Sequence, residues 1–338
     1  MQKAGMPTPR YVAFSVADDK SYSKATKIMQ LSIPQEKMFL KTAGLAEGKG
    51  AIPVRKLSEI PEAFARLKRL KTDGGEGFLV ENWVEGEEFS GYYLGYGGAF
   101  QELGFAQDHK RINNNEEGLN TGGMGAVSPT ELISNHLRKR IRNQIINPLA
   151  ENLIQANREY SGILYLGGMY NKLTDDLWII EFNARWGDPE AQVIVPGISD
   201  FYNLSLSAAK KKVKNPTLFN NKPLLYDGKT RVSVAGTSLG YPDDYATVRG
   251  RRIEGLDKVI KRGEVKVYGA GVTVEDEAFY ANGGRLFHLV GEGDNVEEAR
   301  ALVASEMSRI YIRGDKPGDN LLHFRTDIGL KEVQRKNV

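Results

Sequence analysis

Short apolar runs alternate with helix-periodic stretches at the start of the chain. Residues 11–15, 38–42 and 77–84 are β-prone runs that predict strands. Residues 22–29 and 57–70 carry apolar side chains at helical spacing and predict helices. We therefore expect a small unit of strands and helices, with a glycine-rich loop after its second strand.

The middle of the chain predicts two hairpins and a long helix. Residues 89–105 hold two β-prone runs around the glycine-rich residues 95–98, and residues 163–170 and 177–182 are apolar runs around a polar turn. Residues 131–159, between the two hairpins, have a helical period.

A stretch without periodicity, residues 215–229, is the best candidate for a domain boundary because it contains prolines and few apolar residues in register. Beyond it, residues 231–237, 266–274 and 285–291 predict strands, and residues 296–312 predict a helix. The chain is thus expected to end in a separate mixed domain.

Composition excludes several classes of protein. The 338 residues include 46 Lys and Arg against 43 Asp and Glu, a net charge of +3 that is too balanced for a nucleic-acid-binding protein. No run approaches the roughly 20 apolar residues of a membrane span, and the start lacks the apolar core of a signal peptide. We expect a cytoplasmic protein that binds no membrane. The absence of cysteine excludes disulfides, thiolate metal sites and a cysteine nucleophile.

The four histidines lack the spacing of a metal site. Any bound metal is therefore expected to be Mg²⁺ or Mn²⁺, held mainly by oxygen.

A lysine and a glycine-rich loop follow each other at the second predicted strand. Lys41 stands in the strand, and Gly44, Gly48, Lys49 and Gly50 come after it. Free backbone N–H groups of such a loop can surround triphosphate oxygens while lysine neutralises charge. The spacing is not that of a Walker A loop. Alone, the pattern fits an ordinary surface turn equally well.

Acidic residues close the next strand. The run from Val80 to Glu88 could offer backbone groups to an adenine edge and a carboxylate to ribose hydroxyls. Without context, a solvated acidic turn is the better interpretation of this stretch.

A third pattern combines charge with glycine. Asp108, His109, Lys110 and Arg111 precede the run Asn120, Thr121, Gly122 and Gly123. A phosphorylated, anionic substrate that the backbone approaches closely would account for this density. The alternative is a mobile loop, which gives no reason for hydroxyl, amide and glycines to coincide.

A fourth pattern lies on a predicted strand. With a period of two, Glu181, Asn183 and Arg185 project to one face, where two oxygen ligands and a guanidinium suit a magnesium-bound phosphate. A salt-bridged strand face is the alternative, and it leaves the asparagine and the following GDPE turn unexplained.

In this order the four patterns resemble the phosphoribosylamine–glycine ligase family of ATP-grasp enzymes. The strings that carry the resemblance are KAGMPT, GLAEGKG, VENWVEGEE, QDHKR, NTGGMGAVSP and EFNARWGDPEAQ, followed by SLGYP, ANGGR and RTDIG. The resemblance implies an α+β fold in which two ATP-grasp subdomains grip ATP and a small mixed α/β domain follows. Residues 1–88 would form the lid subdomain with the nucleotide loop, residues 89–215 the catalytic subdomain with the metal site, and residues 216–338 the C-terminal domain.

The resemblance also implies a reaction. ATP phosphorylates the carboxylate of glycine, and the amine of 5-phosphoribosylamine attacks the glycyl phosphate, in de novo purine biosynthesis. The implied ATP-binding residues are Lys41, Gly44, Gly48, Lys49, Gly50, Glu81, Asn82, Trp83, Val84 and Glu88, and the implied ligands of Mg²⁺ or Mn²⁺ are Glu181 and Asn183. The implied catalytic residues are Asp108, Lys110, Arg185 and Asp188, and the implied substrate-binding residues are His109, Arg111, Asn120, Thr121, Gly122 and Gly123.

One departure concerns the start of the chain. The family carries a further domain, with a glycine-rich substrate-binding loop, before the point that corresponds to Met1. We therefore expect weak or no ligase activity from this chain alone, and a separate polypeptide with the missing domain as a partner. Two alternatives stay open: a catalytically silent ATP-binding module or partner subunit, and an ATP-grasp ligase for another carboxylate and amine.

Overall fold

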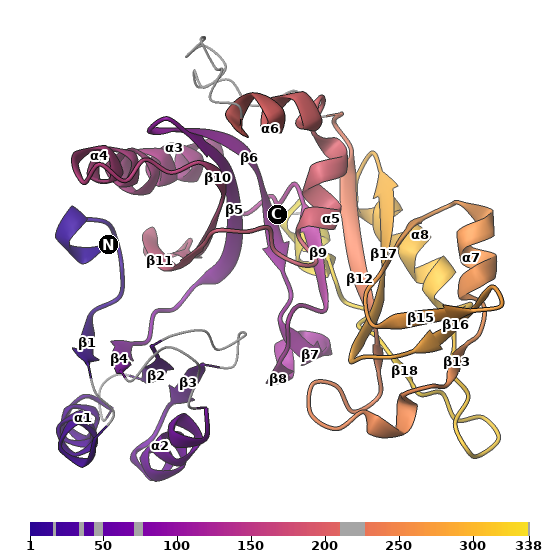
Figure 1. Ribbon diagram of the computed structural model, residues 1–338, viewed down its shortest axis with the longest axis horizontal. Coiled ribbons are helices and arrows are strands. Elements are labelled where there is room, and N and C mark those ends of the chain that lie inside the picture. The colour runs from indigo at the N-terminus through magenta and orange to yellow at the C-terminus, as the bar shows by residue number, and fades with distance from the viewer. Residues whose placement is uncertain (16–17, 34–36, 44–49, 71–76, 210–226, 337–338) are drawn as a thin grey trace. The chain divides into compact units, whose positions relative to one another are not determined.

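The structure is a computed structural model that describes residues 1–15, 18–33, 37–43, 50–70, 77–209 and 227–336 (Figure 1). The chain divides into two compact units. Unit 1 comprises Met1–Gln2, Pro7–Glu87 and Met169–Ile180, and unit 2 comprises Lys3–Met6, Glu88–Gly168 and Glu181–Val338. The expected division into three domains with boundaries at residues 88 and 215 stays a prediction. Within the described ranges, no helix is both long and apolar enough to cross a membrane.

Unit 1 contains a sheet with the strand order β1–β4–β2–β3 and two helices packed on it (Figure 1). Met38 and Leu40 of β2 and Phe78 and Val80 of β4 alternate with less buried neighbours and form the core with the helices. The elements are β1 (Tyr11–Phe14), α1 (Asp19–Ser32), β2 (Met38–Thr42), β3 (Ala51–Val54), η2 (Leu57–Glu59), α2 (Ile60–Arg69) and β4 (Phe78–Asn82), and the short 3-10 helix η1 (Gln2–Ala4) precedes them in the chain.

Strand β3 was not expected from the sequence. It is short and contains Pro53, which cannot donate to a sheet, so it lies at the sheet edge beside β2. The other strands and both helices of unit 1 confirm the predicted elements.

A long sheet follows, in the order β11–β10–β5–β6–β9–β12–β17–β14, with β18 also paired to β12. Its strands are β5 (Glu87–Tyr96), β6 (Ala99–Asp108), β9 (Gly125–Ser128), β10 (Gly162–Asn171), β11 (Asp176–Asn183), β12 (Thr230–Ser238), β14 (Lys266–Gly269), β17 (Arg285–Gly293) and β18 (Leu322–His323). Both predicted hairpins are present, as β5–β6 and β10–β11. The predicted helix over residues 131–159 is present as α3 (Asn135–Ile141), a π-helical turn (Arg142–Ile146) and α4 (Asn147–Gln155).

The remaining elements of unit 2 are a small hairpin, a small sheet of order β13–β16–β15 and several short helices. They are β7 (Arg111–Asn113), η3 (Asn114–Glu116), β8 (Glu117–Asn120), α5 (Ala191–Ile194), η5 (Val195–Gly197), α6 (Phe201–Ala209), η7 (Ala246–Val248), β13 (Arg252–Ile253), α7 (Leu256–Arg262), β15 (Val272–Glu275), β16 (Ala278–Ala281), α8 (Val296–Met307) and α9 (Leu330–Lys336).

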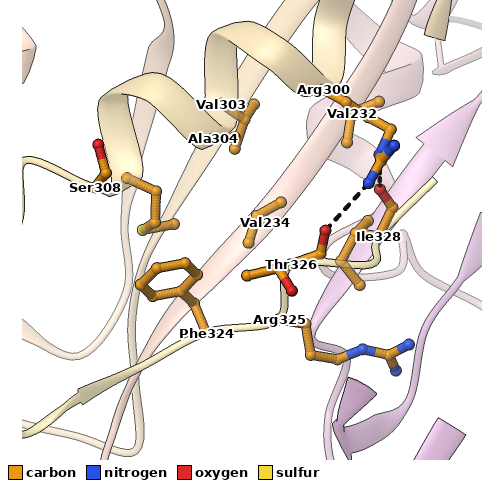
Figure 2. Close-up of a pocket in the computed structure, with 11 residues that line it drawn as sticks. Val232, Val234, Arg300, Val303, Ala304, Ser308, Phe324, Arg325, Thr326 and Ile328 are labelled. Atoms are coloured by element: carbon orange, nitrogen blue, oxygen red, sulfur yellow. Dashed lines mark hydrogen bonds between the residues drawn. The ribbon is translucent and has the colours of Figure 1, made fainter. Parts of the chain in front are cut away.

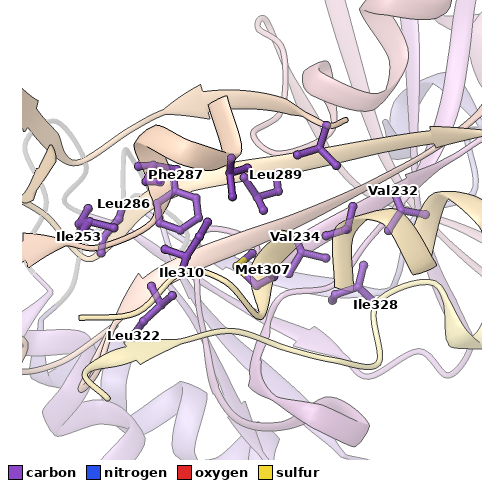
Figure 3. Close-up of a cluster of buried hydrophobic side chains, with 14 of the residues drawn as sticks. Val232, Val234, Ile253, Leu286, Phe287, Leu289, Met307, Ile310, Leu322 and Ile328 are labelled. Atoms are coloured by element: carbon purple, nitrogen blue, oxygen red, sulfur yellow. The ribbon is translucent and has the colours of Figure 1, made fainter. Parts of the chain in front are cut away.

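Helix α8 packs against β12 and β17, and Asn295 caps its first turn by accepting from the Glu298 amide at 2.9 Å. A cavity of about 230 Å³ lies between α8, β12 and the segment that leads into α9 (Figure 2). Next to it, buried side chains such as Phe287, Leu289 and Met307 form the core of this part (Figure 3). Each fully buried side chain of this kind contributes about 1.5–3 kcal/mol.

Two predicted elements of this part are wrong in extent. Residues 266–274 form two strands, because β14 pairs with β17 while β15 pairs with β16. Between them the Gly271 backbone lies so close to Gly283 that an added Cβ would be 2.7 Å from its Cα. The helix predicted over residues 296–312 ends at Met307, since Tyr311 instead forms a β-bridge with Glu254.

Candidate active site

In unit 1, the candidate nucleotide residues lie on two neighbouring strands. Lys41 on β2 faces Leu79, and Glu81 on β4 faces Phe39, so the two charged residues are diagonal neighbours on one face. Lys41 Nζ and Glu81 Oε1 form an ion pair whose side chains are 18% and 10% exposed. Sheet register thus supplies a half-buried lysine with its counter-charge.

At the end of β4, two backbone amides form hydrogen bonds to neighbouring segments of the protein. The amide of Asn82 donates to the Arg10 carbonyl at 2.8 Å, and that of Trp83 to the Lys37 carbonyl at 3.0 Å. The Trp83 ring stacks on Phe39 with centroids 4.5 Å apart. The amides of Asn82 and Trp83, two of the residues expected to meet adenine, are therefore already bonded to protein.

The glycine-rich loop is only partly described. Gly44, Gly48 and Lys49 lie outside the described residues. Gly50, which closes the loop, accepts the Thr42 amide at 3.0 Å and leads into β3.

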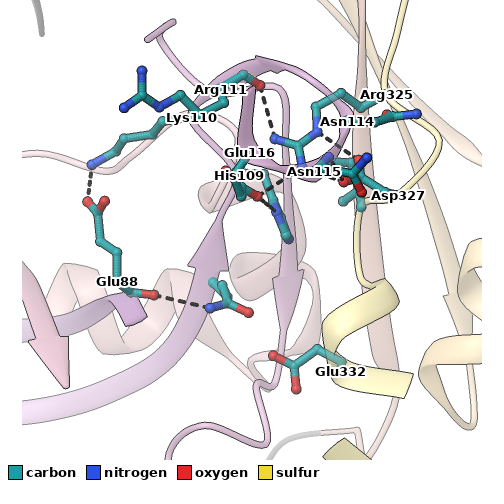
Figure 4. A network of polar contacts seen from close by, with 12 residues as sticks. Glu88, His109, Lys110, Arg111, Asn114, Asn115, Glu116, Arg325, Asp327 and Glu332 are labelled. Carbon is teal, nitrogen blue, oxygen red and sulfur yellow. Dashed lines mark hydrogen bonds and ion pairs between the residues drawn. The ribbon is translucent and has the colours of Figure 1, made fainter. Parts of the chain in front are cut away.

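In unit 2, charged groups gather where β6 ends. Lys110 forms an ion pair with Glu88 (Figure 4). Burial opposes the charge of Lys110, yet Glu88 and other neighbouring groups hold its pKa well above the ordinary value. Burial, and then Glu190, raise the pKa of Asp108 well above its ordinary value. Its Oδ1 atom is buried and has no hydrogen-bond partner in the described part of the chain.

Glu190 is the second buried carboxylate of this cluster, at 3% exposure. Its Oε1 accepts from Ser90 Oγ at 3.1 Å and from the Tyr92 hydroxyl at 3.0 Å. Burial raises the pKa of Glu190 despite these bonds. Two carboxyl groups with raised pKa values therefore lie in one cluster with a one-third-exposed lysine.

The glycine run lies against the same cluster. Gly123 has a φ of +119°, and an added Cβ there would be 3.0 Å from Asp108 Oδ1 and 3.1 Å from the Asp188 carbonyl. Only glycine meets both conditions without strain. Thr121 fixes the run by donating its hydroxyl to the Lys110 carbonyl at 2.8 Å and accepting from the Gly123 amide at 3.0 Å.

Asp188 is held from the C-terminal part of the unit. Arg285 donates to Asp188 Oδ2 at 2.9 Å and to the carbonyl oxygens of Asp188 and Gly122 at 2.7 and 3.1 Å. His288 Nε2 lies 3.5 Å from Asp188 Oδ1, and burial lowers the pKa of this histidine to about 4.

Other predicted substrate residues lie around the β7–β8 hairpin. His109 is buried, with a side-chain exposure of 3%, and its Nδ1 bonds to Glu116 at 2.8 Å (Figure 4). Arg111 donates to the Gly118 carbonyl at 2.8 Å, and Asn120 is its strand partner. The structure thus brings together the side chains of Asp108, Lys110 and Asp188 and the segment 121–123. The His109 ring contacts Glu116 instead.

The predicted metal ligands lie at the end of β11. The Asn183 amide donates to Glu181 Oε1 at 3.1 Å, so the two side chains share a face as expected. Arg185 lies beyond the end of the strand and donates to the Trp186 carbonyl at 2.9 Å. The period-two argument is therefore wrong for Arg185, because the strand stops at Asn183.

Three residues of the cluster were missed in the sequence. Glu190 belongs to the GDPE turn, which the salt-bridge alternative could not explain, and Arg285 ends the ANGGR string. His288 follows shortly after, on β17. Their proximity to Asp108 and Asp188 arises from strand pairing across the sheet, for which local sequence carries no signal.

Comparisons with known proteins place this geometry in context. Residues 1–191 match the family described as phosphoribosylglycinamide synthetase, ATP-grasp (A) domain, and residues 231–331 match the phosphoribosylglycinamide synthetase C domain. A phosphoribosylamine–glycine ligase of Halalkalibacterium halodurans is 33% identical over all of this chain and 73% of its own length. The trifunctional purine biosynthetic protein adenosine-3 of Gallus gallus is 33% identical over 98% of this chain, which spans only 31% of that protein.

Among solved structures, a phosphoribosylamine–glycine ligase from Thermotoga maritima has a TM-score of 0.79 and 27% identity, covering 97% of this chain and 76% of its own. These matches confirm the family and the ATP-grasp fold expected from the sequence.

Proposed function

Because the chain belongs to the phosphoribosylamine–glycine ligase family, a family of ATP-grasp ligases, we propose that it joins glycine to 5-phosphoribosylamine with ATP. The observation that carries this proposal is the buried, unpartnered Oδ1 atom of Asp108 beside Lys110 and Gly123. A cationic ligand next to a buried carboxyl group favours its ionised form and pairs with it. The ammonium group of glycine is such a cation.

The chemistry needs no protein nucleophile. A glycine carboxylate oxygen attacks the γ-phosphorus of ATP and ADP leaves. The amine of 5-phosphoribosylamine then attacks the acyl carbon, and phosphate departs with the former carboxylate oxygen while the amine loses a proton. The protein contributes positioning and charge neutralisation.

The substrate roles are assigned to the cluster of unit 2. Asp108 binds the glycine ammonium group, and Lys110 neutralises charge that develops during phosphoryl transfer. Asp188, which Arg285 orients, and the backbone from Asn120 to Gly123 contact the phosphorylated sugar amine, as do Arg111 and His109. The close approach that Gly123 permits to both acidic residues supports this assignment.

The nucleotide roles are assigned to residues of unit 1 and to Glu88. Lys41 contacts phosphate, the loop of Gly44, Gly48, Lys49 and Gly50 covers the triphosphate, and Glu88 binds ribose. Since the Asn82 and Trp83 amides are bonded to protein, adenine recognition falls to the carbonyl oxygens of residues 81–84 and to the Val84 amide.

ATP-grasp ligases use ATP with a divalent metal. We assign Mg²⁺ or Mn²⁺ to Glu181 and Asn183, whose oxygens share one strand face, with Arg185 on the transferred phosphoryl group. Within the described residues, no group of three or more His, Asp or Glu side chains is placed to hold a metal. Mg²⁺ is commonly bound by only one or two protein carboxylates together with the phosphates of the substrate. One carboxylate and one amide oxygen are therefore a suitable set of protein ligands. The metal, when bound, neutralises charge on the phosphates.

The test is ATP-dependent phosphate release with freshly generated 5-phosphoribosylamine, omitting each substrate in turn. One arm uses the chain alone, and the other adds the part of the Halalkalibacterium ligase that has no counterpart here as a separate polypeptide. Phosphate release that needs all three substrates, in either arm, supports the ligase. Activity in the second arm only would also support the expected partner polypeptide.

Two results would overturn the proposal. Mg-ATP binding by calorimetry without glycine-dependent phosphate release in either arm would indicate the silent module. Phosphate release with another carboxylic acid and amine, but not with these substrates, would indicate a different ATP-grasp ligase. The cytoplasmic location expected from the sequence stays a prediction.

A further inference from the structure

Residues 323–327, at and after the end of β18, are hydrogen-bonded to the β7–β8 hairpin (Figure 4). This hairpin begins directly after Lys110. The Arg325 side chain is 0% exposed. It donates to the Arg111 carbonyl at 3.0 Å, to Glu116 Oε1 at 2.9 Å and to both oxygens of Asp327 at 2.8 Å. The same Glu116 oxygen bonds to His109. One buried guanidinium therefore joins two positions of the hairpin.

Further hydrogen bonds fix the register of the two segments. Asn114 and Thr326 bond reciprocally at 2.9 and 3.1 Å, and the Asn115 amide donates to Asp327 at 2.8 Å. His323 bonds to the Ile112 carbonyl at 2.9 Å. These bonds connect residues more than 200 positions apart in the chain, so the hairpin depends on the C-terminal part for its position.

The hairpin backbone is strained where it is held. Asn115 and Glu116 have φ values of 59° and 57°. These values lie in the left-handed region, which residues other than glycine rarely adopt. Such strain persists where surrounding contacts over-determine it, and it collects at functional sites. Asp327 binds the amide of the first residue and Arg325 the side chain of the second.

Glu116 and Arg325 both carry their charges in this contact. Burial opposes ionisation of Glu116, but the hydrogen bonds from His109 and Arg325 outweigh it and lower the pKa to about 2. Glu116 is therefore an anion at any working pH, and Arg325 is its permanent counter-charge.

We propose that Arg325 is a positioning residue for the substrate loop: through Glu116 and the Arg111 carbonyl it holds the hairpin so that Lys110, Arg111 and Thr121 face the substrate. It contacts no substrate itself, because its donors bond to protein. This inference rests on the proposed ligase function for its kinetic consequence. The alternative is a buried ion pair that only stabilises the fold.

Arg231 offers a matched control. It too is buried, with a side-chain exposure of 4%, and pairs with two carboxylates, Asp227 and Glu292. We expect Arg325→Lys to raise the KM for 5-phosphoribosylamine about tenfold or more while the KM for ATP changes less than about twofold, since only the loop moves. Arg231→Lys should leave both values unchanged at a similar loss of melting temperature. Equal effects of the two variants on KM would overturn the proposal.

A second measurement does not depend on activity. Hydrogen exchange of the Asn115 and Thr121 amides should accelerate at least about tenfold in Arg325→Lys and remain unchanged in Arg231→Lys. If wild-type protein releases no glycine-dependent phosphate, the proposed function fails, and the exchange result still decides whether Arg325 holds the hairpin. Unchanged exchange would overturn the positioning role.

Glu116→Gln serves if Arg325→Lys does not fold. It keeps the side-chain shape but removes the charge that Arg325 holds, so it should accelerate exchange at the same amides by a smaller factor. Where Arg325→Lys does fold, the double variant should show no larger effect than Arg325→Lys alone, because both substitutions act through one contact. Additive effects would count against the proposal.

Discussion

The two candidate sites pair their lysines in the same way but differ in what surrounds the pair. In unit 1, Lys41 and Glu81 neutralise each other as diagonal neighbours on adjacent strands. In unit 2, Lys110 and Glu88 form a similar pair, but Asp108 and Glu190 add two carboxyl groups with raised pKa values. Among the described residues, one lysine and one carboxylate of the first site balance each other, whereas the second site holds two further carboxyl groups.

This difference indicates which site is built for chemistry on a cationic substrate. Buried like charges reduce stability and persist where a function needs them. We therefore expect substitutions in the unit 2 cluster to separate activity from stability, whereas substitutions in unit 1 should act mainly on nucleotide affinity.

The largest expected effect is that of Asp108→Asn. The amide keeps the shape but cannot ionise to meet the substrate ammonium group, so kcat/KM should fall about 100- to 1,000-fold. Because the pKa of Asp108 is raised in the folded state, its ionisation reduces stability as pH rises above the ordinary value of 3.8. The variant should therefore melt at a higher temperature at pH 7, which calorimetry measures.

The exposed Asp243 provides the control, and Asp243→Asn should change neither quantity. Parallel loss of activity and melting temperature in Asp108→Asn would mean that the carboxylate is structural.

Glu181→Gln should weaken metal binding, the second-largest effect that we expect. Loss of one of two proposed ligands should raise the Mg²⁺ concentration for half-maximal activity about 10- to 100-fold, with activity recovered at high metal. Titration of activity with Mg²⁺ and with Mn²⁺ checks this. Glu151→Gln, on the exposed face of α4, is the matched control. An unchanged metal dependence would remove Glu181 from the site.

The two paired lysines provide the direct comparison between the units. Lys41→Met should raise the KM for ATP about tenfold with little change for glycine, whereas Lys110→Met should mainly lower kcat. Lys229→Met removes an exposed pair with Asp294 and should change neither. Steady-state kinetics with each substrate varied separates these outcomes. The same change in the same parameter for both lysines would erase the distinction between the sites.

The last prediction concerns stability and not activity. Burial keeps His288 neutral, with Asp188 and Arg285 as its charged neighbours, and lowers its pKa from 6.5 to about 4. The unfolded chain then binds more protons than the fold as pH falls from 6.5 to about 4, so about 3 kcal/mol of stability is lost across this window.

His288→Asn should flatten this loss, which urea unfolding at pH 7, 5.5 and 4.5 measures. His136→Asn, at an exposed position of helix α3, should leave the slope unchanged. A slope that is equal in wild type and His288→Asn would contradict the assignment.

Local periodicity predicted most of the fold, and it failed where tertiary pairing decides. The β5–β6 and β10–β11 hairpins follow from apolar alternation around turns. Strand β3 was missed because it is short and contains proline, and the last predicted helix was too long because Tyr311 pairs with Glu254.

The candidate site shows the same limit. Lys41, Glu81, Asp108 and Lys110 stand in strings with visible chemistry, and Glu181 and Asn183 share a strand face as their spacing predicts. Glu190, Arg285 and Arg325 reach the site through contacts about 100 to 200 residues apart in sequence, which no local pattern encodes.

The most direct test of the account follows the carboxylate oxygen of glycine. Glycine labelled with ¹⁸O in its carboxylate is incubated with the chain, Mg-ATP and 5-phosphoribosylamine, in both arms of the activity assay, and released phosphate is examined by mass spectrometry. A glycyl phosphate intermediate predicts one ¹⁸O atom in each phosphate, and loss of that signal in Asp108→Asn. Unlabelled phosphate released alongside product would contradict the account.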